Sequence, residues 1–442
     1  MRNRSFTINT AEVLVPVVLA VLTGLVLIVL LAPNLSFGFT GNSNSNLIRI
    51  YSSVPMNSFA SIAHGAQMAF EEAGYKAGDF TLEYVPLDDA RPQNCDAKGQ
   101  NCTVKWATDT ELANARRAAA DPDAMVYIGT YNSGAAKISI PVLNRVNMAM
   151  ISPGNTYPGL TKPGTGTAGE PWVYYPLGVQ TYFRVVPADD LQGAAAAAFA
   201  HEKGFQSVYV LDDTELYGHG IAVIFAQVAR DLGLNVVGGP EGIDVRAQNY
   251  TTLAQKIVAA KPDLVYFGGI TDNHPAQVLD ALLLAGYTGA FMGADGIADK
   301  TFINSTKQPL SNLKGLYSTL VGLPANKLTG PGENWYTLYD ARWHNDDNKD
   351  FAPFGYEAAR VAISAIASAG KKDREAIRAA VTQVSSENLP GGPSILGTWN
   401  FDSHGDTSLV TISVQQAQSG DWAYQGIMSY DAQTKKWTFV QQ

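Results

Sequence analysis

The chain has 442 residues, 46% of them hydrophobic, which is enough for two or three domains with sizeable cores. Its formal net charge of −9 at pH 7 argues against nucleic acid as a partner. The 41 glycines are typical of a loop-rich α/β protein.

Residues 1–46 have the pattern of a membrane-targeting segment. Arg2 and Arg4 precede an uncharged run from Val13 to Ala32, which as a helix would match the ~30 Å core of a bilayer. We favour an uncleaved transmembrane anchor, because we find no small-residue cleavage site after the run; a long cleaved signal peptide stays the alternative. In either case the positive end stays inside, and residues 47–442 are expected outside the cytoplasm.

The two cysteines, Cys95 and Cys102, lie in a polar loop. Outside the cytoplasm we expect them to form a local disulfide, which would stabilise the fold by ~2.5 kcal/mol on a chain-entropy model. Metal binding is the rival interpretation, but two thiols without a nearby histidine make an incomplete zinc site.

The first part of the exported chain alternates strand and helix patterns. Strand 47–54 is followed by an amphipathic helix, for which Ser58 is the expected N-cap. The later patterns predict, in chain order, strand 81–85, an alanine-rich helix near 108–119, strand 125–128, a helix continuing towards Arg145 and strand 147–151. Strands separated by helices predict parallel sheets built from βαβ units.

A Gly/Pro/Tyr-rich loop, residues 158–181, interrupts this alternation. It is too long for an ordinary connection, so we expect a functional or interlobe insertion. Its segment Gly164–Gly169 fits G-x-G-x-x-G literally, but it neither follows a strand nor opens a helix, as a dinucleotide site requires.

The alternation restarts at residues 183–187. The patterns that follow predict helix 189–203, strand 207–211, helix 220–232, strand 235–237, helix 251–260, strand 264–267, helix 275–285 and strand 290–292. The last part of the chain predicts helices near 335–344, 354–369 and 374–384, and then antiparallel strands from Thr398 to the end. Two α/β lobes with a cleft between them are the economical architecture.

Enzyme motifs are missing from the sequence. It contains no P-loop, no H-E-x-x-H and no G-x-S-x-G, and its six histidines are scattered. We therefore expect a protein that is not an enzyme, with no catalytic residue, no metal site and no cofactor.

Two neighbouring turns carry residues that suit a carboxylate ligand. Strand 125–128 leads into a helix that starts near Ser133, and strand 147–151 ends in the segment 152–156 (SPGNT), where we expect a second helix start. Free backbone N–H groups, hydroxyls and a helix dipole would converge there, at the carboxyl ends of parallel strands. Either hydroxyl alone would be a helix cap; together they favour a ligand site with Ser133, Gly154, Asn155 and Thr156.

Three features of the second run face the same cleft. Tyr217 stands at a helix start, Ile270 follows the glycines after strand 264–267, and Asp295 ends another strand between glycines. An aspartate beside glycine commonly forms an Asx turn, which is the alternative for Asp295. A carboxylate across from two anion sites is what a zwitterion needs, with one end for –COO⁻ and the other for –NH₃⁺.

These motifs, in this order, resemble the leucine/isoleucine/valine-binding proteins of ABC importers, which have the type I periplasmic-binding fold. The resemblance covers about residues 47–442. The motifs that carry it are Gly129 with Ser133, Ser152–Thr156, Phe183-Arg184, Asp212 with Tyr217-Gly218, Tyr266–Gly269, Phe291–Gly296 and Phe401–Asp406.

The resemblance implies roles for the site residues. In that family a serine at the position of Ser133 and a threonine at that of Thr156 hold the ligand carboxylate. The same threonine, a carbonyl at the position of Gly154 and an acid at that of Asp295 hold the ammonium. A tyrosine at the position of Tyr217 lines the cleft from the second lobe.

The resemblance also implies the domain organisation. Two doubly wound parallel-sheet lobes are joined by a three-segment hinge near 183–187, 315–319 and 396–401, and they close on the ligand. The implied boundaries are residues 1–46 for the signal or anchor, 47–184 plus 319–396 for lobe 1, and 185–318 plus 397–442 for lobe 2.

The chain departs from the family pattern at three positions. Asp295 is shorter than the usual glutamate, and Ile270 stands in the segment where an aromatic residue is expected. Asn132 replaces a cysteine that relatives often carry, which leaves the Cys95–Cys102 pair as a local disulfide.

The expected function is therefore that of an extracytoplasmic solute-binding protein. It would deliver a branched-chain or other aliphatic amino acid to an ABC permease, as a monomer tethered to the membrane by the N-terminal helix. Two alternatives remain: a binding protein for an amide, urea or aromatic-acid ligand, and a sensory ectodomain anchored by residues 13–32.

Overall fold

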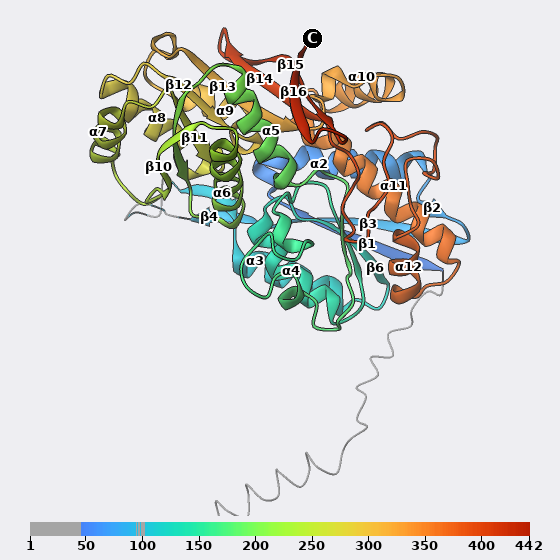
Figure 1. Cartoon of the computed structure of the whole chain (residues 1–442). Coiled ribbons are helices and arrows are strands. Elements are labelled where there is room, and N and C mark those ends of the chain that lie inside the picture. Colours follow the sequence, from blue (N-terminus) through green and yellow to red (C-terminus); the bar gives the residue numbers. More distant parts are fainter. Residues whose placement is uncertain (1–45, 94, 96–97, 99–101) are drawn as a thin grey trace, which may run out of the picture. The chain divides into compact units, whose positions relative to one another are not determined.

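Figure 1 shows a computed structural model of the chain, which describes residues 46–93, 95, 98 and 102–442. The predicted membrane-targeting run, Val13 to Ala32, lies outside these residues. Within them, no helix is long and apolar enough to cross a bilayer.

The first lobe is built on a six-stranded sheet of order β2-β3-β1-β6-β7-β8, in which only β2 and β3 pair antiparallel. Its strands are β1 (Leu47–Val54), β2 (Lys76–Ala77), β3 (Phe80–Asp88), β6 (Ala124–Gly129), β7 (Ala149–Ser152) and β8 (Tyr182–Arg184). The helices packed with it are α2 (Met56–Glu72), α3 (Thr108–Ala120), α4 (Ser133–Asn144), α10 (Pro331–Trp343), α11 (Ala352–Ala369) and α12 (Arg374–Val381).

Both faces of this sheet are covered by helices, so the central strand β6 is buried along its whole length, whereas β3 begins with alternating buried and exposed residues. Successive side chains of a strand point to opposite faces. Ile48 and Ile50 therefore pack in the core that contains α2 and α11, whereas Tyr51 packs with α3 and α4. A Cβ at Gly65 of α2 would lie 2.1 Å from the carbonyl oxygen of Ala352, so α2 and α11 touch backbone to backbone (Figure 1).

The second lobe is built on an eight-stranded sheet of order β10-β9-β11-β12-β13-β14-β15-β16. Its parallel part is β9 (Ser207–Asp212), β10 (Asn235–Gly242), β11 (Leu264–Gly268), β12 (Ala290–Gly293) and β13 (Gly315–Val321), and its antiparallel part is β14 (Ile412–Gln418), β15 (Asp421–Asp431) and β16 (Lys436–Gln441). The helices of this lobe are α5 (Asp189–Glu202), α6 (Leu216–Asp231), α7 (Thr251–Ala260), α8 (Pro275–Leu284) and α9 (Lys300–Ser305).

The chain passes between the two sheets three times, after β8, after β13 and between α12 and β14 (Figure 1). Two α/β lobes with parallel sheets confirm the predicted fold class. The predicted boundary between residues 318 and 319 falls inside β13, so the division into 47–184 plus 319–396 and 185–318 plus 397–442 stays a prediction.

Three local predictions were wrong. Ser58 does not cap α2, because the helix starts earlier, at Met56. The N–H of Met56 donates to Asp88 Oδ1 at 3.0 Å, so a carboxylate from β3 accepts the hydrogen bond at this helix end. The segment 152–156 leads into a three-residue 3-10 turn and not into an α-helix. The terminal antiparallel strands begin at Ile412, because residues 398–411 form turns and isolated bridges.

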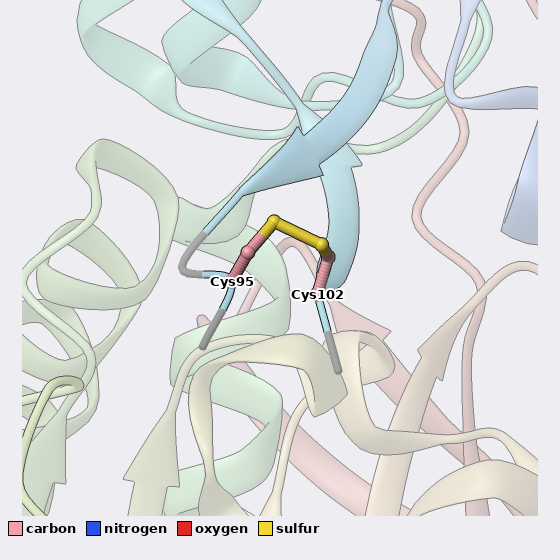
Figure 2. The surroundings of a disulfide bond; sticks show 2 residues. All are labelled: Cys95 and Cys102. Carbon is pink, nitrogen blue, oxygen red and sulfur yellow. A yellow bond between two sulfur atoms is a disulfide. The ribbon is translucent and has the colours of Figure 1, made fainter. Parts of the chain in front are cut away.

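The predicted local disulfide is confirmed. Cys95 and Cys102 are joined with an S–S distance of 2.04 Å. Figure 2 shows the bond just beyond the ends of β4 (Ala90–Gln93) and β5 (Thr103–Trp106), which form a separate two-stranded sheet between β3 and α3.

The side chain of Arg184, at the end of β8, is fully buried at the first crossing between the sheets. Its Nε donates to Asp406 Oδ1 at 2.6 Å, and its Nη1 donates to the carbonyls of Asn155 at 3.2 Å and Tyr157 at 3.0 Å. Burial would raise the pKa of Asp406, but the charge and hydrogen bond of Arg184, together with the charge of Lys162, outweigh burial and hold that pKa below its usual value. The pair therefore stays ionised in the interior.

Replacing Arg184 by methionine should lower the free energy of unfolding by about 3 kcal/mol, because it leaves a buried carboxylate without its main partner. Breaking a buried ion pair commonly costs about 3–5 kcal/mol, and we expect the lower value here because Lys162 Nζ lies 3.4 Å from Asp406 and remains as a partner. Urea denaturation of the full chain measures it. As a control, Arg246→Met breaks an exposed 3.5 Å pair with Asp244 and should leave the midpoint unchanged; equal losses would contradict the assignment.

Candidate functional site

A cavity of about 20 Å³ lies between the two lobes at the carboxyl ends of their parallel strands. Six of the seven predicted ligand residues line it: Ser133, Gly154, Thr156, Tyr217, Ile270 and Asp295. The other lining residues are Trp106, Tyr131, Asn132, Gly134 and Glu215.

The first lobe supplies the end of the cavity that suits a carboxylate. Ser133 is the first residue of α4, where backbone N–H groups lack partners within the helix. Its Oγ accepts a hydrogen bond from Tyr157 N at 3.3 Å, which ties it to the turn that holds Thr156. A Cβ at Gly154 would lie 2.8 Å from Tyr131 Cδ2, so only glycine lets the two turns come this close.

Asn155 does not line the cavity, in contrast to the other predicted residues. It is fully buried behind it, where its Nδ2 donates to Thr130 Oγ1 at 3.1 Å and to the Tyr131 carbonyl at 2.9 Å. Tyr182 donates from its hydroxyl to Asn155 Oδ1 at 3.2 Å. The Asn155 side chain thus fastens the two turns to each other.

The second lobe supplies the opposite, acidic end. Asp295, 7% exposed, accepts a hydrogen bond from the Tyr217 hydroxyl, and that hydroxyl accepts one from Gly296 N at 3.2 Å. Burial raises the pKa of Asp295 to about 6, although the Tyr217 hydrogen bond acts in the other direction. A cation beside Asp295 would restore its ionised form.

A second buried acid, Asp189, lies at this end and was missed in the sequence. Its backbone N–H donates to the Thr156 carbonyl at 2.8 Å. Burial raises its pKa well above the usual value, and the charge of Asp295 adds to the shift. In the described part of the chain, both carboxylate oxygens of Asp189, Gln192 Oε1 and the Tyr266 hydroxyl have no hydrogen-bond partner. None of Asp189, Gln192 and Tyr266 lines the cavity, so the group is buried beside the acidic end and is not part of the cavity wall.

An aspartate in the first turn of a helix normally interacts with the helix dipole, so no sequence pattern distinguishes Asp189 as a site residue. Its neighbour Asp190 does behave as a surface acid, with its Oδ2 at 2.7 Å from Lys162 Nζ. Trp106 was missed because it follows a polar cysteine loop.

A family model described as "Periplasmic binding protein" matches residues 50–419 of the chain. A protein of Pseudomonas aeruginosa, named leucine-, isoleucine-, valine-, threonine- and alanine-binding protein, is 28% identical over 364 residues. That match covers 80% of this chain and 83% of the relative.

Solved structures share the fold. A leucine-binding protein of Thermotoga maritima is 21% identical, with a TM-score of 0.70, over 86% of this chain and 98% of that one. A solute-binding protein of an ABC transporter from R. palustris, in complex with benzoate, is 16% identical, with a TM-score of 0.65, over 86% and 96% of the two chains.

The acidic end makes the stability of the ligand-free protein depend on pH. Because burial raises the pKa of Asp295 to about 6, the folded state holds this proton more tightly than the unfolded chain does. The contribution of protonated Asp295 to the free energy of unfolding is fully present below about pH 4 and is lost as the pH rises through about 6. Asp295→Asn should therefore raise the free energy of unfolding at about pH 8 by roughly 2–3 kcal/mol.

Urea midpoints of the full chain at about pH 4.5, 6 and 8 measure this effect. Asp189, whose pKa is also raised, faces the same acid, so part of the slope remains in the variant. The nearby hydroxyls of Tyr217, Tyr266 and Tyr131 have pKa values raised above their usual value by burial and stay protonated throughout this range. Asp79→Asn, an exposed position, is the control and should follow the parent protein. An Asp295→Asn profile that coincides with the parent's would contradict the prediction.

Proposed function

Because the chain belongs to the periplasmic binding protein family, we propose that it is a solute-binding protein that captures an amino acid for an ABC importer. The first candidates are aliphatic amino acids, the branched-chain ones among them, because the Pseudomonas aeruginosa relative is named for leucine, isoleucine, valine, threonine and alanine. The family implies a location outside the cytoplasm.

The observation that carries this proposal is the polarity of the cavity. At one end are the start of α4 and the hydroxyls of Ser133 and Thr156, which suit a carboxylate. At the other end is Asp295, with the unpartnered carboxylate of Asp189 next to it. An α-amino acid has its two charges on adjacent groups and satisfies both ends at once.

The expected affinity follows from a few charged hydrogen bonds. Each hydrogen bond to a charged group contributes roughly 1.5–3 kcal/mol, so several of them support micromolar binding at about −8 kcal/mol. In the same proposal, Thr156 and the Gly154 carbonyl share the ammonium with Asp295, while Tyr217 and Ile270 close the cavity from the second lobe.

The remaining parts of the proposal concern partners. The lobes close on the ligand about the three crossings, and the closed protein docks on an ABC permease. Residues 13–32 tether it to the membrane as a monomer. It needs no cofactor, binds no nucleic acid and catalyses no reaction, as befits a family of binding proteins.

An aromatic acid is the second candidate ligand. Trp106, Tyr131 and Tyr217 line the cavity, and the R. palustris protein of the same fold binds benzoate. Such a ligand satisfies the carboxylate end but leaves the Asp295 end without a cation. We rank it below an amino acid for that reason.

Calorimetric titration of the full chain with leucine, isoleucine, valine, alanine and glutamate tests the proposal, with des-amino analogues and benzoate as controls. We expect micromolar binding of an aliphatic amino acid and none of its des-amino analogue. Asp295→Ala should weaken binding by ~3–5 kcal/mol, because it leaves the ligand ammonium desolvated and without its counter-ion. Binding of benzoate or of the des-amino analogue in place of amino acids would transfer the assignment to the second candidate.

The affinity should also depend on pH, in the direction opposite to the stability of the ligand-free protein. Below a pKa of about 6, Asp295 must release its proton before it can pair with an ammonium, so affinity falls by up to about tenfold per pH unit. Titrations at about pH 5, 6 and 7.5 measure this slope. In Asp295→Asn the slope should shrink; an unchanged slope would assign the titration to another group.

A further inference from the structure

The disulfide-bonded hairpin, residues 90–106, supplies a wall of the ligand cavity although it is not part of either main sheet. Its second strand, β5, ends at Trp106, which lines the cavity from the first-lobe side. Figure 2 shows the disulfide at the far end of the same two strands. Gln93 Nε2 donates to the carbonyls of Lys105 at 3.1 Å and Trp106 at 2.7 Å, which fixes the backbone at this wall.

Lys105 connects the hairpin to the second lobe. Its side chain is buried, its Nζ donates to Asn273 Oδ1 at 2.9 Å, and the same nitrogen lies 3.9 Å from Glu215 Oε1. Asn273 in turn donates to Asp213 Oδ2 at 2.8 Å. The hairpin is thus held on both sides of the cleft, and Trp106 is held with it.

The indole of Trp106 lies against the start of α4. A Cβ placed on Gly134 would come within 2.7 Å of Trp106 Cζ2, so the ring has no space to retreat in that direction. Trp106, Asn132 and Ile270 line both the ligand cavity and a neighbouring outer cavity of about 360 Å³. Of these three residues, Trp106 has the largest side chain, so it contributes most to the wall that the two cavities share.

The inner cavity is small on the scale of a ligand. Its volume of about 20 Å³ compares with about 360 Å³ for the outer cavity beside it. The ammonium, carboxylate and α-carbon of an amino acid leave little of the inner space for a side chain. Leucine carries three more carbons than alanine, and interiors packed at crystal density do not accept them without moving a wall.

We propose that Trp106 is the residue that sets ligand size, restricting the cavity to amino acids with side chains of about the size of alanine or serine. This inference rests on the proposed amino-acid function and narrows it. Lys105 is a positioning residue, because it acts on the ligand through Trp106 and through the contact that it makes with the second lobe. Larger side chains are excluded as long as the indole separates the two cavities.

The test is calorimetric titration of the full chain with alanine, serine and leucine. The parent protein should bind alanine or serine at least tenfold more tightly than leucine. Trp106→Ala joins the inner cavity to the outer one, so it should raise leucine affinity at least tenfold and abolish the preference. Trp172→Ala, at a tryptophan that is 57% exposed, is the matched control and should keep the parent's ratio.

Lys105→Met tests the positioning role. It removes the contacts with Asn273 and Glu215, so alanine should bind roughly five- to tenfold more weakly while leucine is little affected, and the alanine-to-leucine ratio should fall. Arg91→Met is the control on the same hairpin, because among the described residues the ion pair of Arg91 Nε is with Asp109 Oδ1, at 3.0 Å in an exposed first-lobe position. If Lys105→Met only lowered the free energy of unfolding, the ratio of alanine to leucine affinity would stay unchanged. A change in that ratio therefore distinguishes a positioning role of Lys105 from a general effect on stability.

The outcomes separate this inference from the function on which it rests. Leucine binding to the parent protein as tightly as alanine, or a Trp106→Ala protein with the parent's ratio, overturns the size limit and leaves the amino-acid function standing. Binding of no amino acid at all overturns both. If Trp106→Ala does not fold, Trp106→Phe replaces it. The smaller ring should raise the affinity for leucine at least threefold, and an unchanged affinity for leucine would overturn the inference.

Discussion

The buried guanidinium of Arg184 is the interaction on which the cleft depends. It joins the last strand of the first sheet to Asp406, which lies on the chain returning to the second sheet. The same group bonds the carbonyls of Asn155 and Tyr157, on either side of Thr156. One cation therefore fixes both a crossing between the lobes and a turn of the candidate site. Only arginine has enough donors in a planar fork to do this; lysine has a single nitrogen.

The two buried acids at the other end of the cavity oppose stability. Burial raises the pKa of both Asp189 and Asp295, so each prefers to be protonated in the ligand-free fold. Groups that are unfavourable without a ligand are common at binding sites, because the ligand removes the penalty when it arrives. Under the proposed function, a ligand ammonium beside Asp295 removes this penalty.

The sequence predicted those parts of the site that follow from the order of strands and turns. Ser133 and Asp295 could be found because each follows a buried strand, and parallel strands of a sheet end at a common edge. Contacts between distant segments could not be found. Asp88 of a neighbouring strand caps α2 in place of Ser58, and Asp189 turns inward only because packing sets the rotation of its helix. Local patterns contain no information on either contact.

The backbone contact between α2 and α11 has a consequence for biogenesis. Gly65 of α2 meets the Ala352 carbonyl, and a Cβ at Gly355 of α11 would lie 2.1 Å from the Ile62 carbonyl. The two helices are separated in the chain by the greater part of the second lobe. During N-terminus-first synthesis, this face of the first sheet therefore remains only partly covered until α11 emerges. The first half of the chain exposes apolar surface for that whole period, which is when it is most prone to aggregation.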